Sequence, residues 1–205
     1  GGGWHTVMVG GAHPTGLFSF SQTLATDSGS LQVFQRNLND GQSRRRRTHH
    51  GDGFQLSLDM LYVFDTNIWV AALRSRRGAS FVLLKALSRG LITGAVSAAL
   101  FLEYSEVLRR DESLRNFWIS VDELDNVLAM LASRMIPVPI YFRWRPQLPD
   151  PDDEMVLECA INAGASAIVT FNSQDFLPAI RKFGIEAISP GELVRSTNLV
   201  ERLAE

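Results

Sequence analysis

Four acidic side chains after residue 60 have the type and spacing to bind a metal ion and act on a substrate together: Asp65, Glu103, Asp153 and Asp175. Asp65 ends the apolar run Leu61–Phe64, which is typical of a buried strand. In open parallel sheets, ligands bind in the crevice outside the carboxyl ends of the strands. A carboxylate at that edge is placed to hold a metal ion. The competing interpretation is a helix N-cap, a position that Asp commonly occupies.

Glu103 lies in a predicted helix whose apolar stripe contains Leu100 and Tyr104. At about 100° per residue, Glu103 projects within roughly 60° of Leu100, whereas Glu106 points to the opposite side. A glutamate on the inward face costs several kcal/mol unless a cation, an arginine or a proton compensates its charge. We therefore expect Glu103 to face the same site as Asp65.

The densest acidic cluster is Asp150-Pro151-Asp152-Asp153-Glu154. Acids and a proline are favoured at the start of any helix, so a purely structural role is a strong alternative. Helical phase separates the members of the cluster, because Asp152, Glu154 and Glu158 diverge from Asp153 by roughly 100° or more. Asp153 shares its side of the helix with the apolar residues Val156, Leu157, Ala160 and Ile161. The pattern therefore predicts that Asp153 is the inward-facing acid.

A second predicted strand ends at Thr170 and is followed by Phe171-Asn172-Ser173-Gln174-Asp175. Asn172 is placed to orient a water or a phosphate, and Asp175 is placed to complete an acidic pocket. A helix cap is an equally good interpretation of Asp175. Thr66 and Thr170 are expected to form hydrogen bonds with the carboxylates.

The distribution of histidine restricts the chemistry further. All four histidines precede residue 51, so chemistry in the later part of the chain cannot use a Ser-His-Asp triad, a Cys-His pair or a His-ligated zinc ion. Cys159 is the one cysteine, and it is expected to pack beside the core. The remaining ligands are carboxylates, which suit Mg²⁺ or Mn²⁺.

Length and composition favour a single globular unit. A chain of 205 residues with 45% hydrophobic content can bury one core but does not clearly contain two. One cysteine excludes an internal disulfide, and neither a signal peptide nor a membrane-spanning run is recognisable, which favours a cytoplasmic location without membrane contact. From Met60 onward, 18 acidic and 15 basic residues create no general positive field, so any binding of nucleic acid must be local.

An α/β fold must position these side chains. From Met60 onward, short apolar runs alternate with helical periods, which predicts a mainly parallel sheet of four or five strands with helices on both faces. Pro137 and Pro139 place the third strand at an edge. The predicted strands are Leu61–Phe64, Leu91–Ala95, Met135–Ile140, Ala167–Thr170 and Ile185–Ile188. The predicted helices are Asn67–Leu73, Ser80–Arg89, Ala98–Arg110, Val121–Ser133, Asp152–Ala163, Phe176–Lys182 and one that begins near Pro190.

The first 59 residues differ from the rest of the chain. They contain 10 of the 16 glycines, all four histidines and the run Arg44–Arg47, without a sustained period of 2 or 3.6. We expect residues 1–59 to be a disordered leader or a non-native extension, and residues 60–205 to form the folded domain. The arginine run is more typical of solvated charge than of a nucleic-acid-binding patch.

Taken together, these segments resemble the PIN domain family. The resemblance rests on Val63-Phe64-Asp65-Thr66-Asn67, on Val96-Ser97 leading to Glu103, on Asp150-Pro151-Asp152-Asp153, and on Val169-Thr170-Phe171-Asn172 followed by Asp175. It covers Met60 to about Arg195 and is strongest for the toxin components of type II toxin–antitoxin systems, the VapC-like ribonucleases.

The resemblance implies a three-layer Rossmann-like fold and a ribonuclease that cleaves single-stranded RNA with the help of Mg²⁺ or Mn²⁺. It implies that Asp65, Glu103 and Asp153 are metal ligands. Many relatives carry an aspartate where Asn172 stands, so here Asp175 would have to contribute to the fourth position. The supporting residues would be Thr66, Asn67, Ser97, Asp152, Thr170 and Asn172. The implied partners are RNA and an antitoxin protein, and the implied assembly is a homodimer.

Other interpretations stay open. Arg74, Arg76 and Arg77 are candidates for contact with an RNA backbone, although they fit equally well as ordinary charged residues on the solvent-exposed surface. A non-catalytic module that binds protein or RNA would use the same acids without a metal. A phosphatase of the haloacid-dehalogenase type also begins with a strand ending in Asp, but it requires a second Asp two residues later, where this chain has Asn67.

Overall fold

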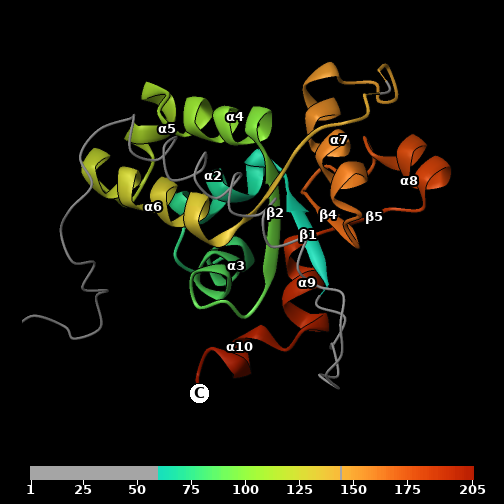
Figure 1. Ribbon diagram of the computed structural model, residues 1–205. Helices are drawn as coiled ribbons and strands as arrows, with labels where there is room; N and C mark the ends of the chain where they lie inside the picture. The colour runs from blue at the N-terminus through green and yellow to red at the C-terminus, as the bar shows by residue number, and fades with distance from the viewer. Residues whose placement is uncertain (1–59, 144) are drawn as a thin grey trace, which may run out of the picture.

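The structure is a computed structural model that describes residues 60–143 and 145–205 (Figure 1). The predicted leader, residues 1–59, lies outside the described residues. Within them, five parallel strands form one sheet in the order β3-β2-β1-β4-β5, which confirms the predicted α/β fold. The strands are β1 (Leu61–Phe64), β2 (Thr93–Ser97), β3 (Ile136–Val138), β4 (Ala167–Val169) and β5 (Glu186–Ile188). β3 lies at an edge, as its prolines require.

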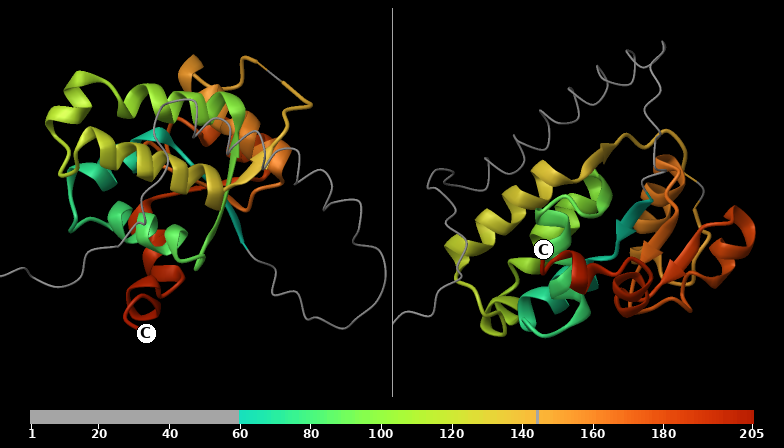
Figure 2. Two further views of the ribbon diagram at one scale, coloured as in Figure 1. Left: turned by 60° about the vertical axis from the view of Figure 1, so that its left-hand side comes forward. Right: turned by 90° about the horizontal axis from the view of Figure 1, so that it is seen from below.

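Helices cover both faces of the sheet. They are α2 (Thr66–Arg74), α3 (Ala79–Ser88), α4 (Ala98–Leu108), α5 (Asp111–Arg115), α6 (Val121–Arg134), α7 (Glu154–Ala163), α8 (Leu177–Phe183), α9 (Pro190–Ser196) and α10 (Leu199–Arg202), and a 3₁₀ turn, η1 (Pro151–Asp153), precedes α7. α7 lies along one face, in contact with four of the strands, whereas α3 packs with α6 and α9 on the other face (Figure 2). Within residues 60–143 and 145–205, no helix is long and apolar enough to cross a membrane.

Four strands differ from their predicted ranges, and β4 and β5 do so only by one residue, since β4 ends at Val169 and β5 begins at Glu186. The second strand begins at Thr93 instead of Leu91, because Gly90 adopts a φ of 72° and the N–H of Leu91 donates to Ala86 O at 2.9 Å. These contacts close α3 and delay entry into the sheet. The third strand is limited to three residues, since its prolines lack the N–H groups that a strand ladder needs.

The helices also depart from the predicted pattern in three places, one of which is α10, a short helix not predicted after α9. α5 was not predicted, because five residues show too little periodicity to be recognised. The predicted helix Asp152–Ala163 divides into η1 and α7, so Asp153 lies at the junction between a 3₁₀ turn and an α-helix.

The core around β1 fixes the position of the strand end. Phe64 is fully buried, and the centroid of its ring lies 4.9 Å from that of the Trp69 ring. The centroids of the Trp69 and Tyr104 rings are 6.2 Å apart. The Tyr104 hydroxyl donates a hydrogen bond to Phe64 O. α4 is therefore joined to the residue that directly precedes Asp65.

Candidate active site

The carboxyl edge of the sheet brings together the segments that carry the predicted acids. Asp65 follows β1 directly, Glu103 lies in the second turn of α4, Asp153 ends η1, and Asp175 lies in the turn after β4. β1 and β4 are neighbours in the sheet, and the N–H of Asp65 donates to Val169 O at 3.0 Å. Since the strands are parallel, these segments reach the same side of the sheet.

Asp65 is buried and firmly held. Its Oδ2 accepts hydrogen bonds from the Thr170 hydroxyl at 2.6 Å and from Asn67 Nδ2 at 2.5 Å. Its Oδ1 accepts from the Asn67 N–H at 3.4 Å, which makes Asp65 the N-cap of α2. Burial raises the pKa of Asp65, although these hydrogen bonds lower it in part. The helix-cap interpretation is therefore correct, and the same carboxylate also lies at the strand edge.

Glu103 projects inward from α4, as its helical phase predicts, and is half-buried, whereas Glu106 is exposed. Its Oε2 is buried and has no hydrogen-bond partner among the described residues. Burial raises the pKa of Glu103, and the charges of Asp65 and Asp152 raise it further. The Thr66 hydroxyl and Arg110 lower this pKa without cancelling the rise. The inward acid thus carries an uncompensated carboxylate oxygen.

Asp153 occupies the residue before α7 but does not cap it. Its side chain forms no capping hydrogen bond within the described residues. The structural alternative is nevertheless confirmed for the cluster, because Asp150 caps η1, Pro151 opens it, and Asp152 and Asp153 lie in its first turn. Burial is the main reason that the pKa of Asp153 is raised to about 7. The negative charges of four other acids add to the rise, in the order Asp65, Asp150, Asp175 and Glu103. Among the predicted acids, Asp153 is therefore the one whose pKa depends on the charges of all the others.

The two residues after β4 contribute differently. Asp175 lies in a turn in which its N–H donates to Asn172 O at 3.0 Å. α8 begins at Leu177 with Phe176 in the N-cap position, so Asp175 is not a helix cap. Asn172 is exposed, and its N–H donates to the Thr170 hydroxyl oxygen at 3.0 Å. Asp175 brings negative charge to Asp153, whereas the neutral Asn172 does not.

The donor set fits a hard divalent cation in chemical type. Its donors are carboxylate oxygens, and burial raises the pKa of the Cys159 thiol to about 12, which makes that buried side chain a poor ligand. No group of three or more Asp, Glu, His or Cys side chains in the described part of the chain is arranged to hold a metal ion. Binding would therefore require the carboxylates to move toward the ion.

Ser97 has a structural place beside these acids. It is buried, and its side chain caps α4 by accepting a hydrogen bond from the Leu100 N–H at 3.2 Å. The cap fixes the start of the helix that carries Glu103.

The arginines proposed from the sequence to contact RNA are not brought to the acidic edge. Arg74, Arg76 and Arg77 are exposed at the opposite end of α2 from Asp65. A helix of this length spans about 14 Å at 1.5 Å per residue. Arg76 lies over the Trp118 ring, 4.0 Å from its centroid. Any contact between these arginines and RNA would be remote from the acids.

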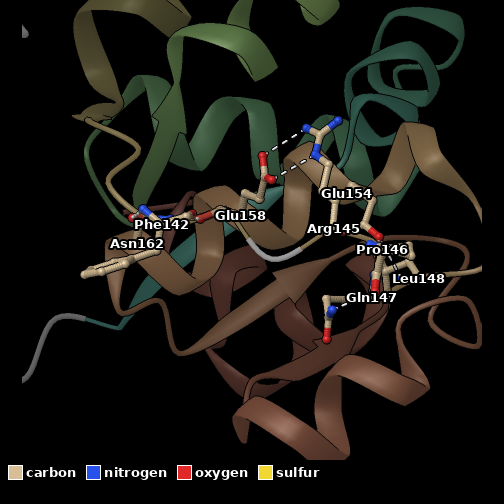
Figure 3. A network of polar contacts seen from close by, with 8 residues as sticks. All are labelled: Phe142, Arg145, Pro146, Gln147, Leu148, Glu154, Glu158 and Asn162. Atoms are coloured by element: carbon tan, nitrogen blue, oxygen red, sulfur yellow. Dashed lines mark hydrogen bonds and ion pairs between the residues drawn. The ribbon is translucent and has the colours of Figure 1, made fainter.

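The sequence pattern missed the burial of two further acids, Glu154 and Glu158. Helical phase directs both away from Asp153, yet only 2% and 5% of their surfaces are exposed. The chain before η1 covers that flank of α7 (Figure 3). Arg145 pairs with both carboxylate oxygens of Glu158, at 2.8 and 2.9 Å. Their burial could have been suspected from the four-residue spacing of the two glutamates, which places them on one helix face, and from the arginine that precedes them in the sequence.

Tyr104 is a second residue whose importance to the site the pattern did not reveal. It was recognised as part of an apolar stripe, but its hydroxyl also joins α4 to β1. Burial raises its pKa well above the ordinary value, so the hydroxyl stays protonated and donates. Tyr104 thus joins the helix that carries Glu103 to the residue before Asp65.

An open parallel sheet with acids gathered at its carboxyl edge defines a Rossmann-like α/β protein with an acidic site. A family model described as PIN domain matches residues 62–174, more than half of the chain. The chain therefore belongs to the PIN domain family, whose members are generally nucleases. The matched residues include Asp65, Glu103 and Asp153 and end one residue before Asp175. Among curated proteins, none matches the chain.

Proposed function

We propose that this chain is a Mg²⁺- or Mn²⁺-dependent endoribonuclease that cleaves single-stranded RNA. The observation that carries the proposal is electrostatic: the charges of Asp65, Glu103 and Asp175 all raise the pKa of Asp153. Acids from three other segments therefore act on the charge of Asp153, in addition to its burial. A divalent cation relieves this repulsion, since like charges at one site favour protons or a counter-ion.

The residues have distinct parts in the proposed reaction. Asp65, Glu103 and Asp153 would hold the cation, which supplies an activated water and stabilises charge on the phosphate during in-line attack. Thr170 and Asn67 keep the Asp65 carboxylate oriented through their hydrogen bonds. Asp175 takes the fourth acidic position, where Asn172 offers no charge.

The resemblance to VapC-like toxins supports a more specific biological role. We propose that the chain is the toxin of a toxin–antitoxin pair that acts in the cytoplasm as a homodimer. Its protein partner would be an antitoxin, encoded by a neighbouring gene for a small DNA-binding or disordered protein. Co-expression with that gene product tests the pairing: a stable complex that suppresses RNA cleavage is expected. A neighbour that neither binds nor inhibits would contradict the toxin role without bearing on the nuclease.

Asp65→Asn tests the proposed chemistry directly. The single amide oxygen of Asn can keep either the α2 cap or the hydrogen bond from Thr170 but not both, so we expect the fold to persist with a modest loss of stability. Residues that orient metal ligands contribute about 10- to 100-fold to metal affinity or activity, so loss of a direct ligand should lower Mn²⁺-dependent cleavage by at least about a hundredfold. Cleavage of a labelled single-stranded RNA measures the rate, and circular dichroism measures the fold.

Asp122→Asn is the matched control for this substitution. Asp122 is an exposed acid in the first turn of α6, far along the chain from every proposed ligand. Its replacement should leave cleavage unchanged. Equal cleavage by Asp65→Asn and the parent protein would rule out the metal-site interpretation.

A non-catalytic binding module is the second candidate function. It is favoured by one observation, that no group of acids in the described residues is already arranged to hold a metal ion. In that case the acids would be neutralised by arginines of a partner. Titration calorimetry separates the two candidates: micromolar or tighter Mn²⁺ binding supports the nuclease, and absence of binding together with absence of cleavage supports the module.

A further inference from the structure

The chain segment that leads into the candidate site is fastened along one face of α7. This segment, residues 141–143 and 145–148, is called the strap. Three side chains of α7 at four-residue intervals hold it: Glu154, Glu158 and Asn162 (Figure 3). At the far end, Asn162 Oδ1 accepts from the N–H groups of residues 141 and 142 at 2.9 and 3.1 Å. Glu158 holds the middle of the strap through Arg145.

The contact nearest to the acids is made by Glu154. Its Oε1 accepts hydrogen bonds from the backbone N–H groups of Gln147 and Leu148, the second at 2.9 Å. Only five residues, 149–153, separate Leu148 from Glu154. One carboxylate therefore joins the two ends of a short loop. Two N–H donors from adjacent residues converge on the same oxygen, which suits this closing role.

The loop that Glu154 closes carries Asp153. Inside it, Asp150 O accepts from the Asp153 N–H at 3.3 Å, and the Asp150 side chain accepts from the Asp152 N–H at 3.0 Å. Pro149 and Pro151 each restrict φ. The loop is thus constrained along its length, and the direction of the Asp153 side chain depends on where the two ends of the loop are anchored.

We propose that Glu154 is a positioning residue, which holds the loop 149–153 closed against the strap and thereby fixes the direction in which Asp153 presents its carboxylate. The inference rests on the proposed function, because it concerns the presentation of a metal ligand. A packing role alone does not explain an acid here. A buried carboxylate costs several kcal/mol unless it is paired and hydrogen-bonded, whereas an apolar side chain of similar size would fill the same space.

Three substitutions test the inference in the full chain: Glu154→Ala, Glu154→Gln and, at the far end of the strap, Asn162→Ala. Glu154→Ala should speed hydrogen exchange at the Gln147 and Leu148 amides about tenfold or more, as expected for the loss of a hydrogen bond. Its Mn²⁺ affinity should fall about 10- to 100-fold, the range for partners that orient metal ligands. Its kcat should fall while its KM for RNA stays unchanged.

The other two variants separate the hydrogen bonds from charge and from general loosening. Glu154→Gln keeps an acceptor oxygen, so its Mn²⁺ affinity and kcat should stay within about fivefold of the parent, the difference between a charged and a neutral hydrogen bond. Asn162→Ala should speed exchange at residue 141 but leave Mn²⁺ affinity unchanged. An equal loss in Glu154→Gln and Glu154→Ala would overturn the hydrogen-bond explanation.

Parent-like Mn²⁺ affinity and kcat in Glu154→Ala, together with faster exchange at the two amides, would overturn the positioning role. If Glu154→Ala does not fold, Glu154→Asp is judged by the same criteria, because its carboxylate is one methylene too short to reach both N–H groups. If the parent protein neither binds Mn²⁺ nor cleaves RNA, the proposed function fails. Unchanged amide exchange in the variant would then show separately that the loop is not closed by Glu154.

Discussion

Asp65 and Asp153 both occupy the residue before a helix and use their carboxylates differently. Asp65 caps α2 and is also held by Thr170, so its direction is fixed by hydrogen bonds of its own. Asp153 makes no capping bond with a described residue, and its direction is set by the loop on which it lies. The position before a helix therefore does not by itself show whether an acid caps that helix.

The raised pKa of Asp153 predicts how stability depends on pH. Burial and the neighbouring acids raise this pKa from 3.8 to about 7. The metal-free protein should be stabilised at low pH, where the carboxyl is protonated, and should lose stability as the pH rises through about 7. Asp153→Asn should therefore be more stable than the parent at pH 8 without metal, by about 1 kcal/mol once solvent screening of a half-exposed group is allowed for.

Urea unfolding at pH 4.5 and pH 8, with and without Mn²⁺, measures this dependence. The advantage of Asp153→Asn should disappear at the lower pH and reverse when Mn²⁺ is present, because only the parent can bind the ion. A variant less stable than the parent at pH 8 without metal would show that repulsion does not dominate at this position.

At the residue scale, helical phase predicted which acids face inward but not which are buried. Glu103 and Glu106 separate as expected, because one helix face packs on the core. The burial of Glu154 and Glu158 was not predictable in this way, since it depends on the strap covering a second face of α7. Contacts of that kind depend on the path of a loop, which periodicity does not encode.

At the element scale, the order and type of the strands were predictable and their lengths were not. Apolar runs located all of the described strands, but the start of β2 was set by the closure of α3 at Gly90. Boundaries of this kind are decided by backbone hydrogen bonds that compete at the end of a helix. The acidic edge was still placed correctly, because the strand that ends at Asp65 agrees with its predicted range.

Gly94, the second residue of β2, tests how tightly the sheet packs behind the site. A Cβ at this position would lie 3.1 Å from Phe64 Cε2 and 3.2 Å from Met135 Cε. Gly94→Ala should therefore lower the free energy of unfolding by about 1 to 3 kcal/mol, the usual cost of overpacking a core. The substitution should also displace Phe64 and so weaken Mn²⁺ binding at the adjacent Asp65.

Gly78→Ala is the matched control, because a Cβ there meets nothing within 4 Å and the backbone φ is −87°. Its effect on the free energy of unfolding should stay within about 0.5 kcal/mol, since a smaller unfolded-state entropy and a poorer helix cap nearly cancel. Thermal and urea unfolding measure both variants. Similar stabilities for the two would contradict close packing around Gly94.

At the scale of the whole molecule, β1 lies in the centre of the sheet, and both of its neighbours come from residues after 60. We therefore expect that removal of residues 1–59 will change the free energy of unfolding by less than about 1 kcal/mol, or about 2–4 °C in Tm for a domain of this size. Mn²⁺ affinity should also be unchanged. Calorimetry of the full chain and of residues 60–205 compares them, and a larger loss of stability would show that the first 59 residues belong to the folded unit.

The pairing of β1 with β4 has a consequence for the timing of protein synthesis. Tyr62 in β1 pairs with Ala167 in β4, so the central strand waits for a partner that the ribosome makes much later. A nascent chain that has reached β3 already carries Asp65 and Glu103 but not Asp153 or Asp175. The nuclease that we propose would therefore remain inert toward its own messenger RNA until the segment that carries Asp153 and Asp175 has been synthesised.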